Sequence, residues 1–112
     1  MTTPVKKNKQ IIYDINHNYA REFKKICDDK NTPQAEILRE LIKDYIQNKD
    51  TFVFNISGGK KSIYDKKSTF LIDIETAQKL KEIADELEDS VSKIVRNLVR
   101  HYINEASKSK EV

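Results

Sequence analysis

The chain has 112 residues, of which 35% are charged and 38% are hydrophobic, and its formal net charge is +3. This length suits one small domain, or two very small units that share a core. No apolar run approaches the roughly 18 residues of a membrane span, and the basic N-terminus lacks the apolar segment of a secretion signal. A single cysteine excludes an internal disulfide, and the two histidines lie far apart in the sequence. We therefore predict no metal site, no cofactor, no membrane association and a cytoplasmic protein.

The N-terminal part of the chain predicts an arm, a strand and a helix. Residues 1–9 are polar and basic, so we expect an arm without regular structure. Apolar and polar side chains alternate over residues 10–15, which predicts a strand. A turn over residues 16–18 follows, with Asn18 as the N-cap of a helix that ends near residues 28–31.

A second helix is predicted from a proline signal. Pro33 suits the first helical position, because its missing N–H would have no partner inside the helix, and Thr32 precedes it as a cap. Apolar residues recur at helical spacing from Ile37 to Ile46, and the helix is expected to end around Asn48.

Residues 50–66 are predicted to be a linker. The alternation that begins at Phe52, and two glycines near the middle of the segment, favour a β-hairpin that returns at residues 62–64. In the alternative interpretation, Phe52 and Phe54 dock on the core while the glycines provide slack.

The C-terminal part repeats the same order of elements. Residues 69–74 alternate like a half-buried strand, and from Ala77 the apolar residues follow helical spacing. Asp89 and Ser90 then offer an N-cap for a second helix that continues to Ile103.

The two parts are related by a constant offset of 57 positions, which is the difference between Tyr13 and Phe70. Further pairs at this offset are Ile15 and Ile72, Phe23 and Leu80, Ile26 and Ile83, Cys27 and Ala84, Ile37 and Ile94, Arg39 and Arg96, Leu41 and Leu98, and Tyr45 and Tyr102. Helical stripes recur by chance, but one offset through a strand, a turn and two helices indicates an internal repeat. The expected organisation is an arm (1–9), a first unit (10–49), a linker (50–66), a second unit (67–106) and a tail (107–112).

Each unit resembles the ribbon-helix-helix fold of the MetJ/Arc and CopG superfamily. The segment FLIDIETAQKLKEIA is similar to the strand-to-helix part of that fold, and SVSKIVRNLV to the start of its second helix, where the first unit reads TPQAEILRELI. The resemblance implies a mainly α protein with a short two-stranded antiparallel β-ribbon. Members of the family usually pair as homodimers, whereas here one chain is expected to form an intramolecular pseudo-dimer.

Elementary packing arguments favour the same architecture. A strand and two helices of this size cannot bury both helical stripes, and a lone strand leaves its N–H and C=O groups unpaired. Two units solve both problems when their strands pair and their helices close around the joined apolar faces.

The resemblance implies that the ribbon enters the major groove of double-stranded DNA and reads base edges. The residues expected on its buried face are Tyr13, Ile15, Phe70 and Ile72. The residues expected on its reading face are Gln10, Ile12, Asp14, Lys67, Thr69 and Leu71. Lysine suits guanine, glutamine suits adenine and threonine suits a base edge or a thymine methyl group, whereas the two large apolar residues suit only thymine methyl groups.

Two other interpretations of the ribbon stay open. Its outer face is unusually apolar for a reading face, which favours coverage by the linker hairpin or by another molecule. A shift of the strand by one residue would instead present Tyr13 and Phe70.

Phosphate contacts are expected from the basic residues ahead of the strands and from the starts of the second helices, where free amides and the helix dipole favour an anion. The predicted set is Lys7, Lys9, Thr32, Gln34, Lys60, Lys61, Lys66, Ser90 and Ser92. The alternatives are solvated arms and ordinary helix caps. Arg39, Arg96 and Arg100 are expected to be solvated or paired with acids such as Glu40. Of the remaining candidates, His17 is interpreted as a turn residue, His101 as a surface residue and Cys27 as a core thiol.

Three functions fit this sequence. The first is a sequence-specific DNA-binding regulator, in particular a repressor that occludes a promoter, with further self-association of chains on neighbouring sites. The second is a TraY-like relaxosome accessory protein of a conjugative element. The third is an antitoxin-like module that holds a protein partner through residues 52–64. No nucleophile, acid/base pair or phosphate loop is recognisable, so no enzyme is predicted.

Overall fold

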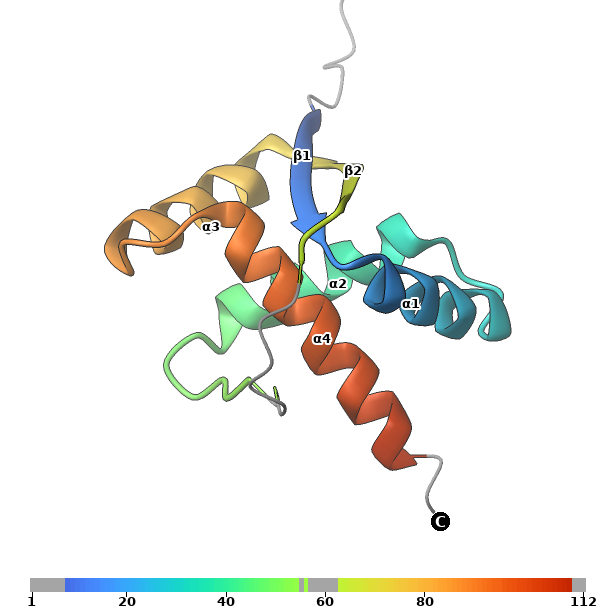
Figure 1. The fold of residues 1–112 in the computed structure, drawn as a ribbon. Coiled ribbons are helices and arrows are strands. Elements are labelled where there is room, and N and C mark those ends of the chain that lie inside the picture. Colours follow the sequence, from blue (N-terminus) through green and yellow to red (C-terminus); the bar gives the residue numbers. More distant parts are fainter. Residues whose placement is uncertain (1–7, 55, 57–62, 110–112) are drawn as a thin grey trace, which may run out of the picture.

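The computed structural model describes residues 8–54, 56 and 63–109 of the chain, and these form two strands and four helices. In chain order they are β1 (Asn8–Ile15), α1 (His17–Asp29), α2 (Gln34–Gln47), β2 (Lys66–Asp73), α3 (Ile74–Glu86) and α4 (Val91–Ser109), as Figure 1 shows. The class is therefore mainly helical with a two-stranded sheet. None of these helices combines the length and the apolar character needed to cross a membrane.

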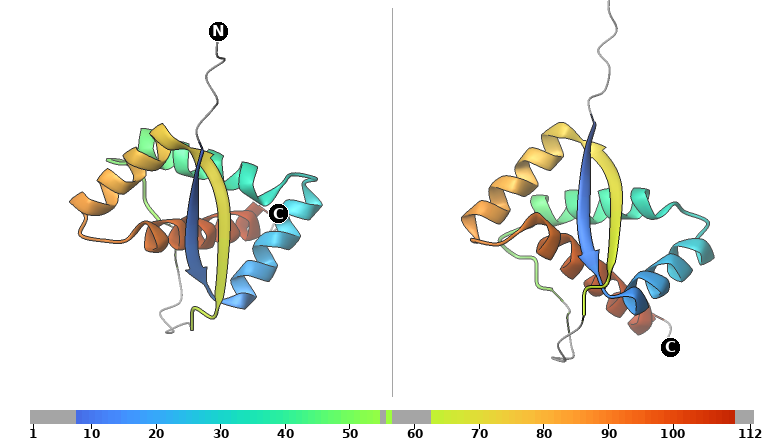
Figure 2. Two further views of the ribbon diagram at one scale, coloured as in Figure 1. Left: turned by 90° about the horizontal axis from the view of Figure 1, so that it is seen from above. Right: turned by 45° about the horizontal axis from the view of Figure 1, so that its top comes forward.

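The two strands pair antiparallel and form a ribbon across one side of the helices (Figure 2). Ile12 lies opposite Thr69 near the middle of the ribbon, and these two residues are themselves 57 positions apart (69 − 12). The pairing is therefore centred on equivalent residues of the two halves. Both strands begin earlier than predicted, and Ile74 is the first residue of α3 rather than the last of the strand.

The inner face of the ribbon forms one wall of the core. Its buried side chains are Ile11, Tyr13, Ile15, Phe70 and Ile72. The rings of Tyr13 and Phe70 meet edge to face with their centroids 6.1 Å apart. Because both rings are almost fully buried, the interpretation that would turn them outwards is wrong.

The helices of each half pack against the other half. α1 contacts α4, and α2 contacts both α3 and α4, in addition to the contacts within each half. Cys27 is fully buried in this shared core, as predicted. Apolar side chains of both halves therefore leave water together, which favours one cooperative unit.

The offset of 57 positions recurs in the structure. It relates α1 to α3 at both ends (17 to 74 and 29 to 86) and the N-cap Asn16 to the N-cap Asp73. After these helices, Asn31 and Glu88 both have a positive φ, of 52° and 56°.

Helix ends of this kind bring the backbone N–H of the next residue to a carbonyl five positions earlier. The structure has this bond after both helices, at 3.0 Å from Thr32 to Cys27 and at 2.8 Å from Asp89 to Ala84. The same local backbone geometry thus follows α1 and α3.

Two predicted helix starts are displaced. Asn16, not Asn18, caps α1, because its side chain accepts from the backbone N–H of Asn18. Pro33 is the N-cap of α2, and the hydroxyl of Thr32 donates to the carbonyl of Lys30 instead of capping the helix. The start of α4 follows the prediction, since Ser90 Oγ accepts from the N–H of Lys93 at 3.1 Å.

The predicted hairpin in the linker is wrong for the residues that the structure describes. Residues 52–54, 56 and 63–65 lie outside any strand, and the predicted turn at residues 57–59 falls outside the described residues. Phe52 and Phe54 instead pack on Tyr45, with ring centroids 5.3 and 5.4 Å away, as in the alternative interpretation.

His101 joins this aromatic cluster. Its ring centroid lies 4.9 Å from that of Phe52, and its side chain is only 14% exposed. The prediction of a surface histidine is therefore wrong, because sequence periodicity does not reveal that the linker covers this side of α4.

Candidate nucleic-acid interface

The outer face of the ribbon carries the six residues predicted to read DNA. In the register of the structure, Gln10 lies opposite Leu71, Ile12 opposite Thr69 and Asp14 opposite Lys67. All are exposed except Asp14, which is partly buried. No described residue of the linker forms a strand beside the ribbon. Phe52 and Phe54 of the linker instead pack on the far side of the core, against α2 and α4.

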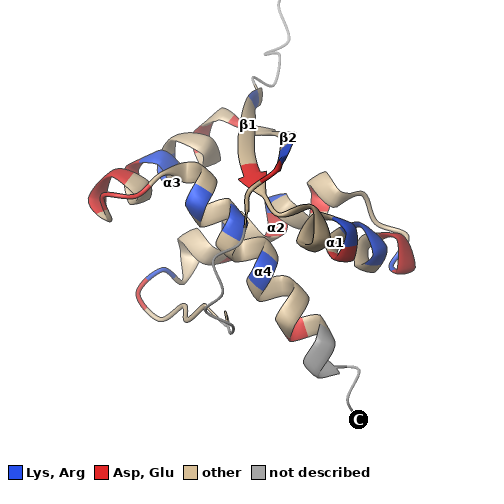
Figure 3. Cartoon of the chain, viewed as in Figure 1, with Lys and Arg blue, Asp and Glu red and all other residues tan. Residues whose placement is uncertain are grey.

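Polar and apolar side chains alternate in this face. Ile12 is 50% exposed and Leu71 is 53% exposed, and they lie diagonally across the ribbon, within reach of one another. Both strands carry lysines (Figure 3), of which Lys67 lies on this face, whereas Lys9 and Lys66 have the strand parity of the buried residues. The one acidic residue of β1 is Asp14. Asp14 faces Lys67 across the ribbon, so the acid is placed beside a cation.

The edge of β1 is fixed to α4. The backbone N–H of Asp14 donates to Ser92 Oγ at 3.0 Å, and the carbonyl of Asp14 accepts from Arg96 at 3.1 Å. The guanidinium of Arg96 also lies over the ring of Tyr64, 3.8 Å from its centroid. Ser92, which was predicted to face phosphate, therefore has a structural partner.

Within the described ranges, the edge of β2 lacks these two contacts. The positions equivalent to Ser92 and Arg96 are Ala35 (92 − 57), which has no hydroxyl, and Arg39 (96 − 57). Arg39 donates to the carbonyl of Ala35 in its own helix, at 3.4 Å, and lines an open cleft of about 770 Å³ beside Leu71.

The surroundings of Arg39, Arg96 and Arg100 differ from the prediction. The sequence predicts solvent or acids such as Glu40, whereas in the structure these side chains contact backbone carbonyls and aromatic rings. Arg100 lies over Tyr19, 5.1 Å from the ring centroid, and Arg96 lies over Tyr64. Arg96 therefore holds β1 and the linker in place, whereas Arg100 packs on α1 and Arg39 bonds within its own helix.

The starts of the second helices also differ between the halves. Ser90 caps α4 because its side chain accepts from the N–H of Lys93, whereas Pro33, the N-cap of α2, makes no side-chain cap bond. Gln34 is the first, exposed residue of α2. The α2 start thus combines the positive end of the helix dipole with an exposed amide side chain.

The remaining predicted phosphate contacts are lysines. Lys9 and Lys66 are exposed, in β1 and at the start of β2. Lys7, Lys60 and Lys61 lie outside the described residues.

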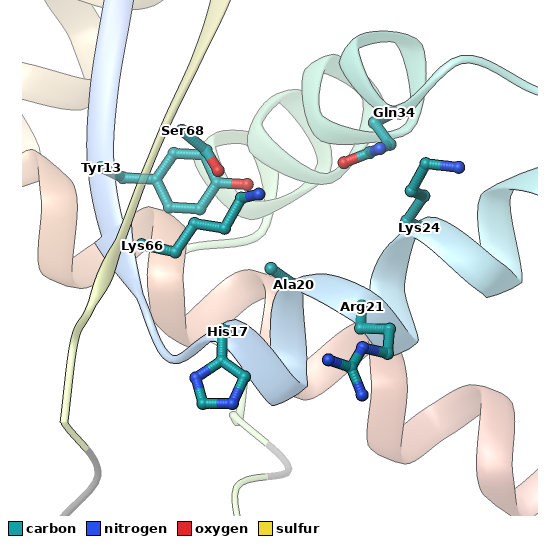
Figure 4. Close-up of a pocket in the computed structure, with 8 residues that line it drawn as sticks. All are labelled: Tyr13, His17, Ala20, Arg21, Lys24, Gln34, Lys66 and Ser68. Carbon is teal, nitrogen blue, oxygen red and sulfur yellow. The ribbon is translucent and has the colours of Figure 1, made fainter.

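A cavity of about 280 Å³ lies beside β2, between the ribbon, α1 and the start of α2. Its polar lining includes Tyr13, Arg21, Lys24, Gln34, Lys66 and Ser68. In Figure 4 the amine of Lys66 reaches toward the hydroxyls of Tyr13 and Ser68, and Gln34 extends toward them from α2. Burial raises the pKa of Tyr13, and its hydrogen bond with Ser68 acts in the opposite direction.

Four of these lining residues are not among the predicted binding residues: Tyr13, Arg21, Lys24 and Ser68. The strand pattern assigned Tyr13 to the core, which is correct for its ring but says nothing of its hydroxyl. A signal was nevertheless present, because the second repeat has Phe70 where the first has Tyr13.

Asp65, a linker residue, binds the first residue of α1. Its carboxylate accepts from the backbone N–H of His17 at 2.9 Å and lies 2.6 Å from His17 Nδ1. These hydrogen bonds keep the pKa of Asp65 below its ordinary value. His17 therefore belongs to a helix start rather than to a turn.

Among the described residues no group of three or more His, Cys, Asp and Glu side chains is placed to hold a metal ion. No protein-family model matches this chain, and neither does any curated protein or solved structure.

Proposed function

We propose that this chain is a sequence-specific, double-stranded DNA-binding protein that acts as a transcriptional regulator. In this proposal it is a tandem ribbon-helix-helix protein whose two halves form a pseudo-dimer. The observation that carries the proposal is the exposed outer face of the ribbon, where Gln10, Ile12, Lys67, Thr69 and Leu71 point away from the core.

The two-stranded shape and the side-chain chemistry of this face support the proposed DNA binding. A two-stranded ribbon fits the major groove, where each base pair presents its own pattern of donors, acceptors and methyl groups. Lys67 and Gln10 supply hydrogen bonds, and Thr69 supplies a hydroxyl and a methyl group. Ile12 and Leu71 add apolar surface, which suits neighbouring thymine methyl groups.

The framework under the face supports it as well. The ribbon is held from below by buried side chains of both strands, and the edge of β1 is fixed to α4 by two hydrogen bonds. A reading face must be rigid, because loosely held side chains lose discrimination between bases.

The test is a titration with duplex DNA at two salt concentrations, followed by selection of the bound sequences from a random pool. Binding should weaken as salt rises, because neutralised phosphates release counterions. A selected site that overlaps a promoter identifies a repressor, and one beside a transfer nick identifies a relaxosome accessory role. The absence of salt-dependent binding at low ionic strength would refute the proposal.

The reading face is tested by single substitutions. Lys67→Ala and Thr69→Ala should each weaken binding to the selected site by ~1 to 3 kcal/mol and relax the preference for one base pair. Lys49→Ala is the control, because Lys49 is an exposed lysine that pairs with Glu86 at the far end of α3. Equal losses for all three variants would mean that the ribbon does not read bases.

A further inference from the structure

The cavity beside β2 gathers basic and hydrogen-bonding side chains from four elements. Tyr13 comes from β1, Lys66 and Ser68 from β2, Arg21 and Lys24 from α1, and Gln34 from the start of α2. None of the described residues that line it is acidic. Lys24 pairs with Asp28 one turn later, whereas Arg21 and Lys66 have no ion pair with any residue in the described ranges.

The other half of the chain does not reproduce this lining. Applying the offset of 57 to the lining residues replaces Tyr13 by Phe70, Ser68 by Ile11, Gln34 by Val91, Arg21 by Gln78 and His17 by Ile74. Only the two lysines have lysine counterparts, Lys9 for Lys66 and Lys81 for Lys24. The flank of β2 is thus polar and basic where the flank of β1 is largely apolar.

This chemistry suits a phosphate group. A phosphate anion needs several donors and positive charge. Lys66, the two hydroxyls and Gln34 supply them on one side of the cavity, and Arg21 lines its α1 wall (Figure 4). The α2 start adds its dipole, and its N-cap has no side-chain bond of its own. The equivalent positions of the β1 flank keep only the two lysines, because Phe70, Ile11 and Val91 replace the hydroxyls and the amide.

We propose that this cavity binds a phosphate group, and that the β1 flank has no equivalent site. The phosphate belongs to a DNA backbone or to a free phosphorylated compound. In the first case the inference rests on the proposed function, and the single phosphate site makes the chain bind its DNA in one orientation.

The pocket itself is tested with inorganic phosphate. At low ionic strength, phosphate should shift the backbone amide NMR signals of Tyr13, Gln34 and Ser68 saturably, with chloride as the control. The equivalent residues of the β1 flank, Phe70, Val91 and Ile11, should not respond. Arg21→Gln, which installs the residue of the other repeat, should weaken this response severalfold, while the reciprocal Gln78→Arg should not.

The source of the phosphate is tested on the selected duplex. The chain offers matched pairs: Lys66→Ala with Lys9→Ala, and Lys24→Ala with Lys81→Ala, of which Lys24 and Lys81 are each 64% exposed and pair with an aspartate four residues later. The first variant of each pair should lower the salt dependence of binding by about one phosphate contact. The second should lower it less, and ethylation of DNA phosphates should interfere on one flank.

Each result has one meaning. A saturable phosphate response with one-sided interference assigns the pocket to the DNA backbone. The same response without a difference between the paired variants assigns it to a free phosphorylated compound. No saturable response, or equal responses on both flanks, overturns the inference. Failure of the duplex to bind at all refutes the proposed function and leaves the phosphate titration readable.

Discussion

At the scale of single residues, Arg96 and Arg39 hold equivalent positions but make different contacts. Arg96 donates to the carbonyl of Asp14 and lies over Tyr64, whereas Arg39 has a long bond to its own helix. Removing Arg96 leaves a partly buried strand carbonyl without its donor and exposes one ring face of Tyr64. Arg96→Ala should therefore lower the free energy of unfolding by ~1 to 3 kcal/mol.

Arg39→Ala is the matched control, and it should change the same quantity by less than ~0.5 kcal/mol. Urea unfolding followed by circular dichroism measures both variants. Equal losses would mean that the two arginines support the fold in the same way and that the edge contact of β1 is unimportant.

At the scale of elements, the start of α3 depends on one carboxylate. Asp73 accepts hydrogen bonds from the hydroxyl and backbone N–H of Thr76, at 2.8 and 3.0 Å, and these bonds lower the pKa of Asp73. A carboxyl with a lowered folded-state pKa stabilises the fold above its unfolded-state pKa of ~4 and loses this contribution as pH falls through the folded value. α3 should therefore weaken in acid.

Asp73→Asn keeps a capping side chain but cannot titrate. The free energies of unfolding of the two proteins should differ most near neutral pH and converge as pH falls through the lowered folded-state pKa of Asp73. The reciprocal change Asn16→Asp, at the equivalent cap of α1, should steepen the loss of stability in acid. Parallel curves for wild type and Asp73→Asn would contradict this role.

At the scale of the whole molecule, folding joins two halves that lie in one chain. Because α1 packs on α4 and α2 on α3, each half completes the core of the other. Such a pairing is unimolecular here, so the thermal midpoint should stay constant when protein concentration rises about a hundredfold.

Cleavage at a protease site introduced within residues 57–62 should make the pairing bimolecular. The midpoint should then rise with protein concentration, because the linker no longer supplies the high effective concentration of one half near the other. Scanning calorimetry over that concentration range compares the intact and cleaved proteins. A concentration-dependent midpoint in the intact chain would show that more than one chain builds the core.

The order of the two strands and four helices and the two faces of the ribbon follow from the sequence, although the strand bounds and the linker hairpin do not. Alternation and helical spacing are local properties, and they predicted Tyr13, Ile15, Phe70 and Ile72 inside and the six outer residues on one face. The offset of 57 predicted that the second half repeats the elements of the first, and the bounds of α1 and α3 follow it. Cap positions were less well predicted, because Asn16, Asn18, Thr32 and Pro33 all favour helix starts.

What lies beside the ribbon depends on tertiary packing. The bonds from Ser92 and Arg96 to Asp14 join residues about eighty positions apart, and the linker aromatics dock on Tyr45 and His101. Such contacts depend on how the helices cross and not on local periodicity. The spacing of residues along the chain therefore does not predict them. For the same reason the cavity exists only where the two strands, α1 and the start of α2 pack together.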